Sequence, residues 1–208
     1  QLPRTVLSTV TAEYATACVA RHEMRSWMML QLEPSALRKS DEFDKRKNAQ
    51  IQANGENLPA TLYRLQAENP DRDIYQELAN RLSELVDGVK EINIDKDDKR
   101  ELFTLMLKFK DGGVFPARSL SDGTLRFVGL SVIELDSKSS GVICLEEPEN
   151  GIHPQKINSM IRLLTEIATD TQYSVDHENA LRQVIINTHS PIVVQLVPED
   201  SLLVAESK

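Results

Sequence analysis

Apolar residues in the C-terminal half of the chain gather in short runs. Residues 142–145 form one run, and residues 184–187 form a second strand candidate. Such runs are typical of strands buried on both faces of a parallel sheet. Between them, apolar residues recur every three or four positions, as on one face of a helix, at Ile157, Ile161, Leu164 and Ile167. Because a helix usually connects parallel strands, the pattern predicts a strand–helix–strand unit.

The N-terminal part has a different pattern, which predicts helices and then a small antiparallel unit. Polar and charged residues, interrupted by Pro34 and Gly55, favour a loop over residues 33–57. Asp71 or Asp73 is suited to cap the helix expected at residues 74–85. Helical spacing covers residues 5–32, 58–65 and 74–85, and strands are expected around residues 92–94 and 102–109.

These patterns divide the chain after residue 118. Residues 1–118 form a helical and antiparallel segment, and residues 119–208 form a lobe that contains the parallel strands. A final apolar run at residues 202–205 suits one more strand. A length of 208 residues and 40% hydrophobic content suit one domain with a sizeable core.

Charge and cysteine content narrow the class of protein. A net charge of −8 argues against attraction to DNA along the whole chain. The only cysteines are Cys18 and Cys144, which argues against a disulfide framework and makes a cytoplasmic location the default expectation. No apolar run approaches the length of a membrane helix, and the first residues lack the layout of a signal peptide.

The candidate chemistry begins at the end of the first parallel strand. Glu146 and Glu147 follow the apolar run directly, and ligands of open α/β sheets bind at this end of the strands. Adjacent ionised carboxylates need a cation, water or solvent to offset their repulsion. Asn150 and Gly151 then suit a tight turn, and Pro154 suits the start of a helix. A solvated strand terminus would explain the acids alone equally well.

Two other polar stretches fit the same place. Residues 188–191, which include His189, follow the second parallel strand, although a lone histidine is more often structural than catalytic. Residues 119–124 form a polar turn before an apolar run that suits a buried helix. The start of that helix would present free backbone N–H groups to an anion, or would be an ordinary helix cap.

Together these motifs resemble those of a known class of ATPases. LSDGT at Leu120–Thr124, ICLEEPENGIHP at Ile143–Pro154 and INTHSP at Ile186–Pro191 look like the signature motif, the Walker B motif with its D-loop, and the switch histidine of ABC-type ATPase heads. The most similar group is the AAA-like ATPases of the overcoming-lysogenization-defect type, related to RecF and structural-maintenance-of-chromosomes (SMC) heads. NGENLPATLYRL, at residues 54–65, also resembles a segment of these proteins.

The resemblance implies an α/β fold, that of a P-loop NTPase of ABC type, with a mainly parallel sheet flanked by helices. It implies ATP and Mg²⁺ as cofactors, with Glu147 as general base, Glu146 as the acid that holds Mg²⁺ through water, and His189 as the γ-phosphate sensor. The remaining nucleotide contacts would come from the signature turn and the D-loop, namely Ser121, Asp122, Gly123, Asn150 and His153. The chain departs from the wider class at Glu146 and His153, where Asp is common, and at Asp122, where transporters have Gly.

One expected part is absent from the sequence. A phosphate-binding P-loop needs GxxxxGK followed by Ser or Thr, and none of the eight glycines begins that pattern. The chain therefore resembles the C-terminal half of a head, with the P-loop half upstream or in a companion chain. By resemblance, the other partners would be a second head in a homodimer, a nuclease or toxin effector, and DNA through the complex.

The favoured function is therefore ATP binding and hydrolysis by a dimerising head, in DNA repair, chromosome maintenance or anti-phage defence. One alternative is a metal-dependent nuclease or phosphatase built on Glu146, Glu147, His153 and His189. It leaves the polar turn at residues 119–124 unexplained. Another alternative is an interaction module that does not hydrolyse nucleotide.

Overall fold

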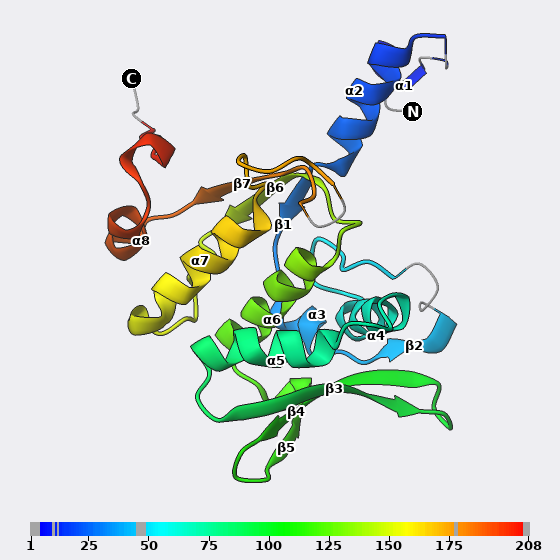
Figure 1. Cartoon of the computed structure of the whole chain (residues 1–208), viewed down its shortest axis with the longest axis vertical. Coiled ribbons are helices and arrows are strands. Elements are labelled where there is room, and N and C mark those ends of the chain that lie inside the picture. The colour runs from blue at the N-terminus through cyan, green and yellow to red at the C-terminus, as the bar shows by residue number, and fades with distance from the viewer. Residues whose placement is uncertain (1–4, 10, 12, 45–48, 177–178, 206–208) are drawn as a thin grey trace.

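The computed structural model describes residues 5–9, 11, 13–44, 49–176 and 179–205. Two sheets lie on either side of a central helix (Figure 1). The first sheet is parallel, in the order β1-β6-β7, with strands Met28–Leu30, Gly141–Glu146 and Arg182–Asn187. The second sheet is antiparallel, in the order β2-β4-β3 with β5 paired to β4, and its strands are β2 Asp41–Glu42, β3 Val89–Asp97, β4 Leu102–Phe109 and β5 Val114–Pro116.

The helices of the described residues connect and cover these sheets. The central one is α6, Asp122–Leu135, which is buried along most of its length. The α-helices around it are α1 Val6–Thr9, α2 Ala15–Ser26, α3 Pro34–Leu37, α4 Leu58–Glu68, α5 Ile74–Leu85, α7 Ile157–Ile167 and α8 Pro191–Leu196. Short 3₁₀ turns include η2 Ala117–Ser119, η3 Pro154–Lys156 and η4 Glu199–Ser201.

Most sequence-based elements are confirmed. Helix α5 begins where the pattern placed it, and the Asp73 carboxylate caps it by accepting a hydrogen bond from the Gln76 N–H. Strands β3 and β4 are antiparallel. Strands β6 and β7 are parallel and joined through α7, which confirms the strand–helix–strand unit.

Three expectations were wrong. The helix expected over residues 5–32 ends at Ser26, and Met28–Leu30 is strand β1, because its parallel pairing with β6 outweighs its helical spacing. The loop expected over residues 33–57 contains α3 and β2. Residues 202–205 form no strand, and Leu203 is 99% exposed.

One cluster of buried apolar side chains joins the two parts of the chain. It contains Leu62 and Leu105 from the N-terminal side and Leu130 and Met160 from the C-terminal side. The division after residue 118 stays a prediction, because the two segments share this core. Among the described residues, no helix has both the length and the apolar character needed to cross a bilayer.

The parallel sheet is buried on one face only. On that face, Leu30, Ile143 and Val184 belong to the main apolar cluster. On the opposite face, Met29 and Ile185 flank Cys144 in register and are 64% and 49% exposed. The prediction that both faces are buried was therefore wrong, since the described residues supply a covering layer to one face alone.

Candidate active site

The site is built at the carboxyl end of β6. Glu146 is the last residue of the strand and lies in register with Asn187 of β7. The Glu147 N–H then donates to the Asn187 carbonyl oxygen at 2.8 Å. Glu147 has a φ of 43°, in the left-handed region that residues other than glycine rarely adopt. Such backbone strain is often found at functional sites, and here it sets the direction of the Glu147 side chain.

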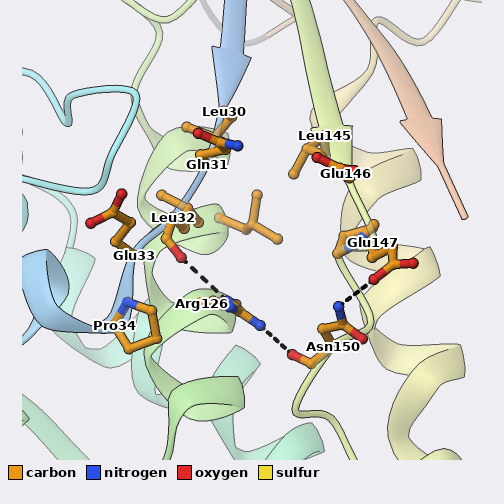
Figure 2. A pocket seen from close by; sticks show the side chains of 12 residues that line it. Leu30, Gln31, Leu32, Glu33, Pro34, Arg126, Leu145, Glu146, Glu147 and Asn150 are labelled. Atoms are coloured by element: carbon orange, nitrogen blue, oxygen red, sulfur yellow. Dashed lines mark hydrogen bonds between the residues drawn. The ribbon is translucent and has the colours of Figure 1, made fainter.

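Hydrogen bonds fix the loop that follows. The Asn150 Nδ2 donates to the Glu147 Oε2 at 2.6 Å (Figure 2). The Arg126 Nη1 donates to the Asn150 carbonyl oxygen at 2.6 Å, and its Nε donates to the Leu32 carbonyl oxygen at 3.2 Å. Arg126, on helix α6, therefore ties the loop after β6 to the segment after β1.

A cavity of about 330 Å³ opens between these two segments. Its lining carries three carboxylates, those of Glu33, Glu146 and Glu147, against the single positive charge of Arg126. The amide of Gln31 adds a further oxygen donor. Carboxylate and amide oxygens suit Mg²⁺, which usually keeps several waters and takes few protein ligands. The donor set therefore fits a hydrated divalent cation better than an unaccompanied phosphate.

His189 lies beside the second acid. Its Nε2 is 4.0 Å from the Glu147 Oε1, and its side chain is 82% exposed. Its neighbour Thr188 donates a hydrogen bond from Oγ1 to the Glu149 Oε1. The two parallel strands thus bring Glu147 and His189 together, as expected from strands whose ends meet at one edge.

The signature turn lies outside the cavity. Ser121 caps α6, and its Oγ accepts a hydrogen bond from the Thr124 N–H at 3.2 Å. The Asp122 carboxylate pairs with Arg38 at 2.5 Å. Gly123 packs against the backbone of Gly151, so the turn contacts the loop after β6.

His153 is also outside the cavity. It is exposed, and its Nδ1 accepts a hydrogen bond from the Gln155 N–H at 3.3 Å at the start of η3. Within the described residues, no three His, Cys, Asp or Glu side chains form a group able to hold a metal. The four residues named for a metal-dependent nuclease or phosphatase therefore do not form a ready-made metal centre.

Sequence reasoning missed two residues of the site. Gln31 directly follows β1 at the same edge as Glu146, and it was missed because β1 was interpreted as helix. The signal was available, since a polar residue after a short apolar run is what identified Glu146. Arg126 had no local signal, because its role depends on carbonyl groups from two distant segments.

Comparison with known proteins identifies the family. The profile of the family described as "AAA domain, putative AbiEii toxin, Type IV TA system" matches residues 3–195. The chain belongs to this family. This AAA-domain membership, with the parallel sheet flanked by helices, confirms the α/β class and supports an ATPase-type function.

Two solved structures similar to this AAA-domain chain are SMC heads. One is the Pyrococcus furiosus Smc head domain with an extended coiled coil, bound to the C-terminal domain of ScpA. It is 8% identical, with a TM-score of 0.41 over 88% of this chain and 41% of that chain. The other is the Pyrococcus yayanosii Smc head domain with a coiled coil and joint, 8% identical, with a TM-score of 0.37 over 84% of this chain and 30% of that chain. The chain thus spans less than half of either solved chain. No curated protein matches it.

Proposed function

We propose that this chain supplies the hydrolytic half of an ATPase site, in which Glu147 orients the attacking water. The observation that carries the proposal is the position of Glu147 at the end of β6, held by Asn150 and facing His189. Phosphoryl transfer depends mainly on positioning and charge stabilisation, and an acid, a histidine and a metal-binding acid at one sheet edge are the parts it needs.

Each residue has a defined task in this proposal. Asn150 holds the Glu147 Oε2, which leaves Oε1, on the side of His189, to accept a hydrogen bond from water. His189 donates a hydrogen bond to the terminal phosphate. Glu146 holds Mg²⁺ through water, and Gln31 adds an amide oxygen near it. The bound Mg²⁺ would neutralise charge on the phosphates.

The exposed face of the parallel sheet supports the proposal that a P-loop half is supplied from outside this chain. Parallel sheets are normally covered on both faces, yet Met29 and Ile185 remain exposed on this one. Glu146 lies on the same face, since residues two apart in a strand share a face and Cys144 is on it. A helix that follows a P-loop would cover this face, and the P-loop lysine would add positive charge to a cavity lining in which Arg126 is the one cationic side chain among the described residues.

A second head is the proposed partner across the signature turn. Ser121, Asp122 and Gly123 sit next to the Asn150–His153 segment through the contact of Gly123 with Gly151, and they lie outside the cavity of their own chain. This arrangement suits contacts to a nucleotide held by another subunit. In a homodimer, the signature turn of each subunit would contact the nucleotide held by the other.

The proposal for the pathway rests on the family description. The family description names a toxin of a toxin–antitoxin system, which favours anti-phage defence and a toxin or nuclease effector over DNA repair or chromosome maintenance. DNA would then be reached through the complex, since the net charge is −8. A cytoplasmic location stays a prediction.

ATP binding and turnover test the proposal directly. The chain should be measured alone and joined to whatever coding sequence adjoins Gln1, or with a companion chain that carries a P-loop. We expect Mg²⁺-dependent ATP hydrolysis in the joined protein and none in the isolated chain. If the joined protein binds no nucleotide, the ATPase proposal is wrong and the non-hydrolysing module is favoured. Metal-dependent cleavage of nucleic acid without ATP would instead favour the nuclease.

A further inference from the structure

The carboxyl group of Glu149 is buried beside the site without being part of the cavity. Glu149 is only 9% exposed, and its Oε1 accepts a hydrogen bond from the Thr188 Oγ1. Its Oε2 is buried and has no hydrogen-bond partner among the described residues. Burying a carboxyl with an unsatisfied oxygen is unfavourable, so packing alone is a poor reason for an acid at this position.

The contact joins the two segments that carry the proposed catalytic pair. Glu149 lies two residues after Glu147, in a turn closed by the Asn150 N–H donating to the Glu147 carbonyl oxygen at 3.0 Å. Thr188 directly precedes His189, and its Oγ1 also accepts a hydrogen bond from the Ser190 N–H at 3.0 Å. The Thr188 hydroxyl therefore connects the turn around His189 to the turn around Glu147.

Among the described residues, no hydrogen bond of this kind holds the His189 side chain itself. It is 82% exposed, and its contact with Glu147 is a distant one of 4.0 Å. The direction of the imidazole is therefore set by the backbone on either side of it. The link from Glu149 to Thr188 fixes that backbone from outside the cavity, where a nucleotide would not displace it.

We propose that Glu149 and Thr188 are positioning residues that hold His189 at its distance from Glu147. The inference rests on the proposed ATPase function, and it extends that function to a pair that touches neither nucleotide nor metal. Glu149 and Thr188 act only through His189. Their loss should lower the turnover number while leaving ATP affinity nearly unchanged.

The test compares two substitutions at one position in the ATP-hydrolysing protein. Thr188→Val removes the hydroxyl at constant shape, and we expect turnover to fall about tenfold with the ATP dissociation constant changed less than about threefold. Thr188→Ser keeps the hydroxyl and should retain turnover to within about threefold. Thr165→Val, which removes a hydroxyl bonded within helix α7, is the matched control and should leave turnover unchanged.

A double-mutant cycle separates positioning from general stability. In a His189→Ala background, Thr188→Val should have no further effect on turnover, because the residue through which Thr188 acts is gone. If the two effects add, Thr188 does not act through His189 and the inference is overturned. Turnover that is unchanged in Thr188→Val overturns it as well.

Hydrogen exchange gives a readout that does not require turnover. Glu149→Ala should raise the exchange rate of the Ser190 amide, 41 positions away in sequence, about tenfold or more, while amides in helix α5 keep their rates. Unchanged exchange at Ser190 would overturn the link even in a protein with no ATPase activity. If the wild-type protein fails to hydrolyse ATP while Glu149→Ala still raises exchange at Ser190, the proposed function is overturned and the link is kept.

Discussion

The backbones of Gly123 and Gly151 meet so closely that a Cβ atom at position 123 would lie 2.2 Å from the Gly151 carbonyl oxygen. This contact joins the first turn of α6 to the loop after β6, which carries Asn150 at the cavity. A backbone oxygen cannot rotate out of the way as a flexible side chain can. The position therefore requires glycine for steric reasons, in addition to any role in contacting nucleotide.

Gly123→Ala should lower the stability of the fold. The methyl group must push the loop around Gly151 outward, which we expect to cost about 1–3 kcal/mol of unfolding free energy. Gly129→Ala in the same helix is the matched control, because the atoms nearest to its Cβ would be side-chain ends, those of Leu32 at 3.2 Å, Leu37 at 3.3 Å and Ile51 at 3.6 Å. Its better helix propensity should offset that contact. Thermal unfolding measures the midpoint of each variant. A Gly123→Ala midpoint equal to that of the wild type would contradict the steric explanation for glycine at position 123.

Glu147→Gln should abolish hydrolysis and preserve folding. The amide keeps the size of the side chain and an oxygen for Asn150, but it is a far weaker acceptor for a proton from water. We expect turnover to fall about 10²–10⁴-fold with ATP binding retained. Glu42→Gln, an equal charge change at the exposed residue of strand β2, should leave turnover unchanged. Normal turnover in Glu147→Gln would refute the assignment of the base.

Ser121→Arg should prevent ATP-dependent pairing of heads. A long cation at the start of α6 would fill the space that the proposed second head must approach. Light scattering with ATP, in the Glu147→Gln background, measures the pairing. Ser83→Arg on the exposed side of α5 is the control for the added charge. Pairing that survives Ser121→Arg would argue against a signature contact between subunits.

Asp136→Ala should destabilise the protein strongly. Asp136 is 2% exposed and pairs with Arg64, which is 4% exposed and also donates to the Ala49 carbonyl oxygen at 2.6 Å. Removing the acid leaves a buried guanidinium with less compensation, and about 3 kcal/mol of unfolding free energy should be lost. Asp98→Ala removes an acid that is 72% exposed and paired with Lys96, and it should cost less than about 1 kcal/mol. Chemical denaturation compares the two, and equal losses would contradict the role given to burial.

Local patterns predicted the parts of the fold that local forces determine. A stretch of about a dozen residues was enough to predict each of three features: the cap at Asp73, the periodicity of α5 and the strand that ends at Glu146. Strand β1 was not, because three apolar residues after a helical pattern become a strand only through pairing with β6. Sequence reasoning therefore singled out the acids and His189, which the structure places at one sheet edge, but missed Gln31.

The hydrogen bonds around the acids could not be predicted from the sequence either. Arg126 acts through main-chain carbonyl groups, which every residue has, so no side-chain pattern marks its partners. Burial of one sheet face depends on which segments are available to cover it. The exposure of Met29 and Ile185 could therefore be learned only from the structure.

The pairing of β1 with β6 sets the order in which the protein can fold during synthesis. Strands β3, β4 and β5 follow one another and can pair as soon as they leave the ribosome. Met28 can pair only after Ile143 has been synthesised, and strand β7, which precedes His189, is synthesised later still. Pairings between distant segments form slowly. We therefore expect a nascent chain whose antiparallel sheet is complete well before the sheet edge with Glu147 and His189 is assembled. A chain arrested before residue 182 would contain that sheet and no assembled candidate site.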